Sequence, residues 1–358
     1  MSGSAQLQAE LERLTQRSAP GIAAVVVKDG EATEEASAGL ADIDSGATTT
    51  LDTVHLWFSM TKIVTATAVM QLAERGELDL DDPVQQFVPE FPQPRSGWPE
   101  VRIRHLLSHS GGLANPIPVR WVHLAGSEAR DPHDFALELL DRNRKLRYPA
   151  GSKAAYSNLG YIVLGEVIAA AGGQRYEDYV RAEILEPLSM THTGFGYEHL
   201  GDDVATGYQR RLSPMTPLFR VMLPKGIIGR RVGRYLSFNR FCVDGPPYGG
   251  LIGSAHEAAR FMAAHINGGE ADGVRLLTPE SALEMQAVQA SGSKLQVGFG
   301  WFRRGKDKSQ DASHLEHLGG GGGFWNMMRI YPERRMGVLA MGNATSYDHD
   351  GIARAALQ

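Results

Sequence analysis

A serine and a lysine three residues apart, Ser59 and Lys62, are the first pair in this sequence whose types and spacing could perform covalent chemistry. They begin an apolar run that predicts a helix over 59–75, stopped by Gly76. Residues three apart share one helix face, and a lysine amine whose pKa is lowered by burial could accept the serine proton. The alternative is an N-cap serine followed by a solvated lysine. Taken alone, the four residues favour that alternative, because short motifs are common.

A second Ser-x-x-Lys, from Ser291 to Lys294, lies in the polar stretch QASGSKLQ, which has no helix behind it. Such a stretch predicts a loop. Context therefore separates the two copies, and the first is the candidate for catalysis.

Two later stretches join the Ser59 motif. Tyr156-Ser157-Asn158 stands at the entrance of a second apolar helix, and HLGGGGGF, from His317 to Phe324, precedes a predicted strand. In this order the three stretches resemble the elements Ser-x-x-Lys, Tyr-x-Asn and Lys/His-x-Gly of the serine β-lactamase and penicillin-binding-protein-like hydrolases. Further stretches are similar to the class C-like and family VIII carboxylesterase branch, within matches running from about residue 20 to 343: 105–113, 148–168, 184–195 and 249–262.

The resemblance implies a role for each motif residue. Ser59 is the expected nucleophile that forms an acyl-enzyme, Lys62 its close base, and Tyr156 the residue that shuttles protons to the leaving group. A phenol needs nearby positive charge to ionise at neutral pH, and Lys62 could supply it. Which of Lys62 and Tyr156 is the immediate base stays open. Asn158 is expected to hold Lys62 and to contact the acyl side of the substrate.

The third motif implies the oxyanion hole. Its donors are expected to be the backbone N–H groups of Ser59 and Gly320, next to Gly319, although five consecutive glycines leave this register open by one residue either way. His317 stands where lysine is usual, and a histidine is mostly neutral at pH 7. The change weakens the case for efficient β-lactam hydrolysis and fits esters, or amides that carry a free D-amino group.

Other candidate sites are declined. His105 and His109 have helical zinc-ligand spacing but lack the glutamate of a metalloprotease and a third ligand, so no metal is expected. Glu166 is expected to be structural rather than a deacylating base. Ser237-Phe-Asn239 is a rival Ser-x-Asn without an apolar helix behind it. No Gly-x-Ser-x-Gly is present, which excludes the α/β-hydrolase elbow.

Composition limits the class of protein. The 358 residues are 42% hydrophobic with a formal charge of −5, which argues against a general nucleic-acid binder. The single cysteine, Cys242, excludes an intrachain disulfide. The N-terminus has no apolar signal region and no run is long enough to span a bilayer, so a cytoplasmic protein without stable membrane insertion is expected. A sequence trimmed of its signal peptide would look the same.

Strands are predicted at both chain ends and helices between them. The sequence therefore predicts an α+β, β-lactamase/transpeptidase-like fold, in which both ends form one antiparallel sheet flanked by helices. The expected domains are residues 1–76 with 245–358, which hold the sheet, and 77–244, mainly helical. Within the latter, residues 204–243 contain eight Arg or Lys and no Asp or Glu, interleaved with apolar residues. We expect this basic flap (residues 204–243) to turn an apolar surface towards acyl chains or anionic substrates. A solvated loop or an oligomer contact is equally compatible.

The sequence thus predicts a serine hydrolase, in first place a carboxylesterase acting on small to medium acyl esters. The alternatives are a D-aminopeptidase or amidase, a weak β-lactamase, and a non-hydrolysing penicillin-binding-like scaffold. The expected partner is a small-molecule ester or amide, with no cofactor. Oligomeric state is not predicted.

Overall fold

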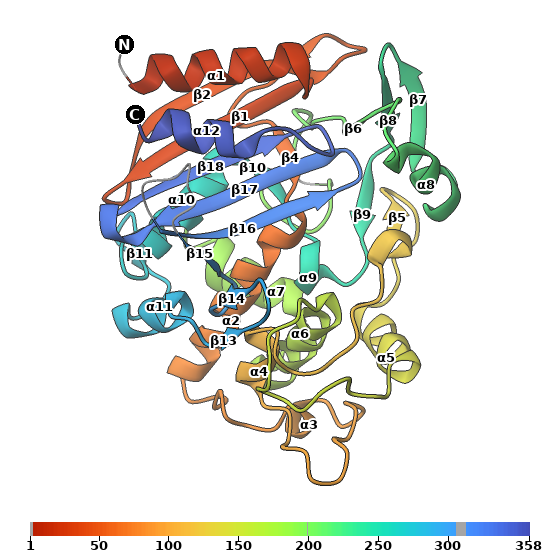
Figure 1. The fold of residues 1–358 in the computed structure, drawn as a ribbon, viewed down its shortest axis with the longest axis vertical. Helices are drawn as coiled ribbons and strands as arrows, with labels where there is room; N and C mark the ends of the chain where they lie inside the picture. The colour runs from red at the N-terminus through yellow and green to blue at the C-terminus, as the bar shows by residue number, and fades with distance from the viewer. Residues whose placement is uncertain (1–2, 199, 306–312) are drawn as a thin grey trace.

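The computed structural model describes residues 3–198, 200–305 and 313–358. The structure contains one antiparallel sheet of nine strands, in the order β13-β14-β15-β16-β17-β18-β1-β2-β3, whose long strands lie in the upper half of Figure 1. Three strands come from the N-terminal end: β1 (Gly21–Lys28), β2 (Glu31–Asp42) and β3 (Ala47–Thr48). Six come from the C-terminal end: β13 (Ala290–Ser291), β14 (Gln296–Val297), β15 (Phe302–Arg304), β16 (His314–Gly321), β17 (Phe324–Tyr331) and β18 (Met336–Gly342). The predicted fold class is confirmed.

The two chain ends meet where β1 pairs with β18, from Ile22 opposite Gly342 to Lys28 opposite Met336. Asn343 secures this junction, since its Oδ1 accepts from Gly21 N–H at 2.7 Å and its Nδ2 donates to the Leu40 carbonyl at 2.9 Å. β1 is buried along nearly its whole length, because helices cover both faces of the sheet. That burial explains its continuous apolar sequence.

Helices α1 (Gly3–Arg17) and α12 (His349–Ala356) cover the outer face of the sheet, at the top of Figure 1. Their core side chains include Leu7, Leu11 and Ile352, which are fully buried. The opposite face carries α10 (Ala255–Ile266), whereas α2 (Thr61–Glu74) packs against other helices, among them α11 (Pro279–Gln286). α2 is buried all round from Thr61 to Leu72, which is why its sequence is apolar without an amphipathic stripe.

Between α2 and the basic flap, the chain forms helices joined by long loops. Its helices are α3 (Val84–Phe87), α4 (Ile103–Leu107), α5 (Pro132–Arg142), α6 (Asn158–Gly172) and α7 (Tyr176–Val180), which leads into the π-helical turn η3 (Arg181–Leu185). α6 packs against α2 and thereby brings the Tyr156 stretch next to the Ser59 stretch. The domain boundaries at residues 76 and 244 stay a prediction.

The basic flap is more ordered than a loop. It forms a three-stranded sheet of β6 (Tyr208–Arg210), β8 (Tyr235–Phe238) and β7 (Ile228–Val232), with α8 (Met215–Met222) between β6 and β7. Its last strand, β9 (Phe241–Val243), pairs with β5 (Val122–Leu124). The flap therefore carries its own hydrogen-bonded scaffold beside the main sheet (Figure 1). No helix in the described ranges is both long and apolar enough to cross a bilayer.

Candidate active site

Ser59 lies in a short 3-10 turn, η1 (Phe58–Met60), between β4 (Val54–Leu56) and α2. The predicted helix start at 59 is therefore corrected: the α-helix begins at Thr61. Phe58, just before the serine, has φ of +49°, a conformation that costs energy for a bulky residue. Its ring packs near Phe241 and Phe324, with ring centroids 6.3 and 6.5 Å away. This packing holds the turn that presents the Ser59 hydroxyl.

The Ser59 Oγ lies within hydrogen-bond distance of both predicted partners. Lys62 Nζ is 3.0 Å away, and the Tyr156 hydroxyl donates to Oγ at 2.7 Å. The three residues lie on two segments 97 positions apart. The structure thus brings together the three residues for which catalysis is predicted.

Lys62 is buried between aromatic rings. Its Nζ lies 4.9 Å from the ring centre of Tyr156 and 5.3 Å from that of Tyr248, and it donates to the Tyr248 carbonyl at 2.7 Å. Tyr248 belongs to α9 (Pro246–Gly249). Burial lowers the pKa of Lys62 well below its ordinary value. No carboxylate in the described ranges forms an ion pair with Lys62 that would oppose this effect. Burial therefore shifts the balance from the ammonium towards the neutral amine.

Tyr156 is affected in the same direction, towards the uncharged form. Burial raises the pKa of its phenol, and the hydrogen bond with Ser59 opposes this only in part. The expectation that Lys62 would supply positive charge to ionise Tyr156 is therefore corrected. Burial thus shifts both groups towards their uncharged forms, an amine and a phenol, with one hydroxyl between them.

Asn158, the first residue of α6, also departs from its expected contact. Its Oδ1 is buried without a hydrogen-bond partner among the described residues, so the predicted hydrogen bond to Lys62 is not formed. The Tyr248 carbonyl holds Lys62 instead. Asn158 does line the cavity beside Ser59.

His317 lies behind the site rather than at its surface. Its ring is 2% exposed, does not line the cavity, and makes a 2.6 Å hydrogen bond from Nδ1 to the Gly300 carbonyl. Burial lowers the pKa of His317 to about 3. The predicted contact of His317 with substrate is therefore corrected: its neutral ring packs 5.0 Å from the Phe302 ring.

The glycine run lets the sheet pass close to the turn η1 that carries Ser59. A Cβ on Gly319 would lie 2.0 Å from the Trp57 carbonyl oxygen, and one on Gly321 would lie 2.3 Å from the Phe58 ring. Only glycine fits at these two positions. Gly320, Gly321 and Gly322 line the cavity, whereas Gly319 does not.

Ser59 opens into a cavity of about 390 Å³. The basic flap forms much of its wall with Met215, Phe219, Leu223, Ile227, Phe238 and Phe241, and other segments contribute Pro118, Val119, Val122, Tyr248, Trp325 and Thr345. No charged side chain lines it in the described part of the chain. The sequence predicted the apolar surface of the flap. It gave no signal for the Tyr248 carbonyl, because a backbone group leaves no mark in residue type.

The declined candidates have local roles. His105 Nδ1 accepts from the Arg102 N–H at 3.0 Å, and His109 Nδ1 accepts from the Ser157 N–H at 3.2 Å. Ser237 accepts from the Arg230 N–H in the flap sheet. Among residues 3–198, 200–305 and 313–358, no cluster of histidine, cysteine or acidic side chains could hold a metal ion.

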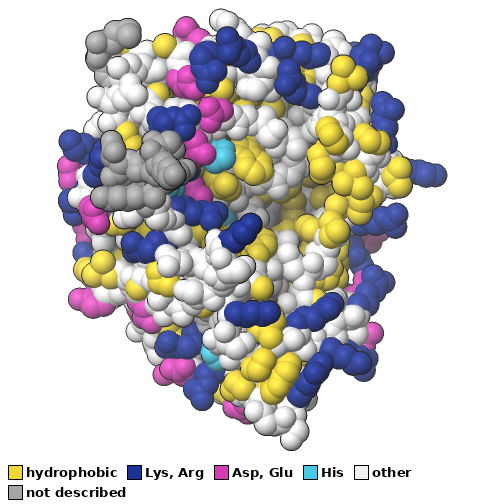
Figure 2. All heavy atoms as spheres, in the orientation of Figure 1, with side chains coloured by type: hydrophobic (Ala, Val, Ile, Leu, Met, Phe, Trp, Pro, Cys, Tyr) yellow, Lys and Arg dark blue, Asp and Glu magenta, His cyan; other side chains and the backbone are white. Residues whose placement is uncertain are grey.

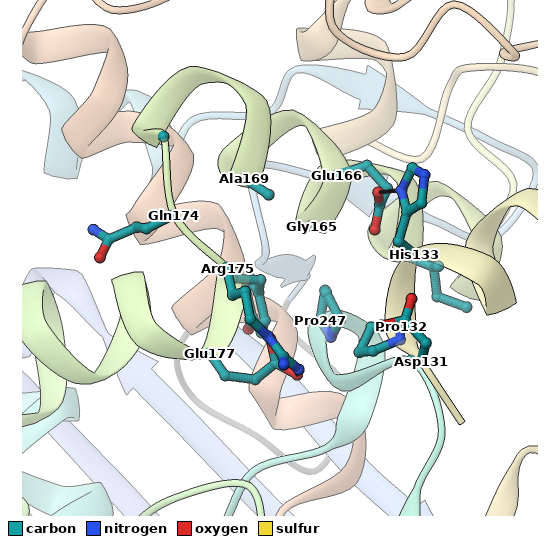
Figure 3. A pocket seen from close by; sticks show the side chains of 14 residues that line it. Asp131, Pro132, His133, Gly165, Glu166, Ala169, Gln174, Arg175, Glu177 and Pro247 are labelled. Carbon is teal, nitrogen blue, oxygen red and sulfur yellow. Dashed lines mark hydrogen bonds and ion pairs between the residues drawn. The ribbon is translucent and has the colours of Figure 1, made fainter. Parts of the chain in front are cut away.

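Glu166 faces a different cavity, shown in Figure 3. Its carboxylate pairs with His133 Nδ1 at 2.5 Å, as the dashed line marks. Pro247 also lines this cavity, and its neighbour Tyr248 accepts the hydrogen bond from Lys62. The structural role expected for Glu166 agrees with this contact.

Comparison with known proteins places the chain among relatives. It matches the family model described as Beta-lactamase over residues 7–358. It is similar to esterase EstB of Burkholderia gladioli, with 37% identity over 199 residues that cover 51% of this chain and 49% of EstB. It is also similar to protein flp of Staphylococcus aureus (strain COL), with 24% identity over 331 residues that cover 91% of this chain and 60% of flp. The chain thus spans about half to three fifths of the length of these relatives.

The fold also matches solved structures. D-amino acid amidase from Ochrobactrum anthropi SV3 superposes with a TM-score of 0.77 at 21% sequence identity, over 100% of this chain and 98% of the amidase. At this identity the similarity shows the fold alone.

Proposed function

The chain belongs to the Beta-lactamase family, and on that premise we propose that it is a carboxylesterase that forms an acyl-enzyme on Ser59. The family includes serine hydrolases of several substrate classes, so the choice among them depends on the cavity. The preferred substrates are small to medium acyl esters without charge near the scissile bond.

The observation that carries this proposal is a nucleophile triad at the end of an uncharged cavity. Ser59 Oγ is bonded to Tyr156 and close to Lys62, and no Lys, Arg, His, Asp or Glu lines the cavity in the described ranges. A β-lactam carboxylate or a free amino group in this cavity would be desolvated without a partner of opposite charge. An apolar acyl ester has no such cost. The relationship to EstB, whose name describes an esterase, supports the same choice.

In the acylation step the neutral Lys62 amine accepts the Ser59 proton while Oγ attacks the ester carbonyl carbon. The hydrogen bond that Lys62 donates to the Tyr248 carbonyl orients the amine, and Nζ lies 3.0 Å from Ser59 Oγ, within reach of its proton. The new Oγ–C bond converts the carbonyl oxygen into an oxyanion. Lys62 becomes an ammonium in a buried site, and the adjacent oxyanion offsets part of that cost.

Two backbone N–H groups are assigned to the oxyanion, those of Ser59 and Gly320. The loop of two residues after β16 makes Gly321 and Phe324 the closing pair, and bonded and non-bonded pairs alternate along an antiparallel ladder. Gly320 therefore directs its N–H away from β17. β15 pairs with β16 only as far as Glu316, so this N–H is not taken by a neighbouring strand.

In the collapse of the intermediate the C–O bond to the alcohol breaks. The Tyr156 phenol gives its proton to the departing alkoxide. The phenolate then recovers a proton from the Lys62 ammonium, which also lies within hydrogen-bond distance of Ser59 Oγ. In deacylation a water takes the place of the alcohol. The water gives a proton to the Lys62–Tyr156 pair as it attacks the acyl carbon. The bond between that carbon and Ser59 Oγ then breaks, Oγ takes the proton back, and the carboxylic acid departs.

A substrate panel tests the assignment. We expect p-nitrophenyl esters with two- to eight-carbon acyl chains to be turned over with kcat/KM at least about 100-fold above nitrocefin and D-amino-acid anilides, a difference of about 3 kcal/mol. Ser59→Ala is the control and should abolish all turnover. A higher kcat/KM for D-amino-acid anilides or nitrocefin would replace the esterase assignment with the amidase or β-lactamase alternative.

A further inference from the structure

Exposed apolar side chains gather beside the mouth of the Ser59 cavity. Of the seven large apolar side chains that stand exposed in the described part of the chain, five belong to the flap or to the loop that packs on it: Ile117, Leu212, Met215, Leu218 and Val221. Leu212 is 96% exposed and Val221 78%. Figure 2 shows apolar side chains gathered on this side of the molecule, with Lys and Arg side chains beside them. Single exposed apolar residues need no explanation, but such a group marks an interaction surface.

α8 is apolar on both sides. Phe219 points into the cavity and Met215 also lines it, whereas Leu218 and Val221 face solvent. Arg220 is the only charged residue of this helix. Large apolar side chains of a helix are normally covered by other parts of the protein. The outer face of α8 therefore lacks a covering layer.

The surroundings of this face are strongly basic. The flap contains eight Arg or Lys and no acid, in a chain whose formal charge is −5. Arg230 pairs with Asp44, but Arg211, Arg220 and Arg231 form no ion pair with the described residues. Protruding apolar side chains among unpaired cations suit an anionic lipid surface, where the cations contact headgroups and the apolar side chains enter the acyl boundary.

The position of the cavity favours lipid over a second copy of the chain. Met215 is at once exposed and part of the cavity wall, and Ile117 adjoins Pro118 and Val119, which also line the cavity. A protein partner seated there would cover the entrance, whereas a lipid surface would deliver apolar esters to it. We propose that Leu212, α8 and Ile117 dock on an anionic lipid surface, so that the Ser59 cavity opens onto acyl esters held in that surface. This proposal rests on the proposed esterase function and names the source of its substrate.

Binding is tested without catalysis. Ser59→Ala protein is mixed with vesicles of phosphatidylcholine alone, or with about 30 mol% phosphatidylglycerol, and sedimented. We expect binding to the anionic vesicles only, lost at high salt because ionic screening removes the attraction to the headgroups. The Leu212→Asp/Val221→Asp and Arg211→Glu/Arg220→Glu variants should each reduce the bound fraction about tenfold or more. Leu283→Asp is the matched control, since Leu283 is 66% exposed but lies on α11, and it should bind as the parent protein does.

Two results would overturn the proposal: no binding of the parent protein to anionic vesicles, or a loss of bound fraction in Leu283→Asp as large as in the flap variants. If the parent protein forms a dimer by size exclusion that Leu212→Asp/Val221→Asp dissolves, and no vesicle binds, the occupant is a second copy. The four substituted flap residues do not line the cavity, so hydrolysis of soluble p-nitrophenyl butyrate by these variants on an intact Ser59 background should be unchanged. If the proposed esterase function is wrong, p-nitrophenyl butyrate is not hydrolysed, whatever the result of the vesicle-binding experiment.

Discussion

At the residue scale, replacing Lys62 with arginine separates charge from proton acceptance. Arginine keeps a cation next to Ser59 but stays protonated at every accessible pH, so it cannot accept the serine proton. We expect kcat to fall by about a thousandfold or more, without recovery up to pH 10, because a general base is lost. In the parent protein kcat/KM should fall as pH drops through the lowered pKa of Lys62, because protonation removes the acceptor. A Lys62→Arg variant with a kcat close to that of the parent protein would show that Lys62 is not the base.

Lys62→Met should show how much folding stability the buried lysine costs the protein. The pKa of the Lys62 amine is lower in the folded chain than in the unfolded chain, so the unfolded chain binds a proton more readily. At pH values below the unfolded-state pKa, this difference destabilises the folded parent protein. The methionine variant should therefore be inactive yet more stable by about 1–2 kcal/mol at pH 7. Its advantage should narrow as pH rises towards the ordinary lysine pKa. Urea unfolding at several pH values measures this, and a less stable variant contradicts it.

The sequence identified Ser59, Lys62 and Tyr156 through the order of three motifs. It could not predict their charge states, because those depend on burial by distant segments such as α9. It also placed His317 and Asn158 in contacts that the fold does not make, since a motif records neighbours along the chain and not side-chain direction.

At the element scale, the close approach of β16 to η1 predicts the effect of Gly319→Ala. The added Cβ would lie 2.0 Å from a backbone oxygen that cannot rotate away, so the strand must move. We expect a loss of about 1–3 kcal/mol in unfolding free energy and at least tenfold in kcat, because the adjacent Gly320 N–H shifts. Gly305→Ala is the control, because its Cβ would meet no atom within 4 Å. Equal effects of the two variants would contradict this account.

The β5–β9 pair beside the cavity carries a pH-dependent contact. His123 Nδ1 lies 2.6 Å from Asp244 Oδ1, and this hydrogen bond raises the pKa of His123 to about 9. The folded chain holds the proton more tightly than the unfolded chain, so the contribution to stability is full below the unfolded pKa and is lost as pH rises through about 9. The melting temperatures of parent and His123→Ala should therefore converge between pH 7 and pH 10. A difference that widens over this range would show that another interaction dominates.

Elements with strong local signals were predictable, among them the helix after Ser59 and the strands GIAAVVVK and GFWNMMRIY. The 3-10 turn at Ser59 and the flap sheet were not. The turn depends on Phe58 being held at positive φ by distant rings, and the flap strands are short pieces that become strands only through pairing.

At the scale of the whole molecule, the catalytic arrangement depends on a sheet closed by both chain ends. Strands at each end predicted that sheet, but the pairing of β1 with β18 joins residues more than 300 positions apart, and no local pattern specifies such a partner. The sheet fixes β16 against the nucleophile turn, while the helices between the chain ends supply Tyr156 and the flap supplies the apolar wall. The sheet, the helical segments and the flap therefore come together around the Ser59 hydroxyl.

The most direct test of the account is the mass of the intact protein after reaction with a fluorophosphonate, with peptide mapping of the adduct. The account predicts one adduct per chain, on Ser59, absent from Ser59→Ala and strongly slowed in Lys62→Arg. An adduct on another residue, or none while esters are still hydrolysed, would contradict the assignment of Ser59 as the nucleophile.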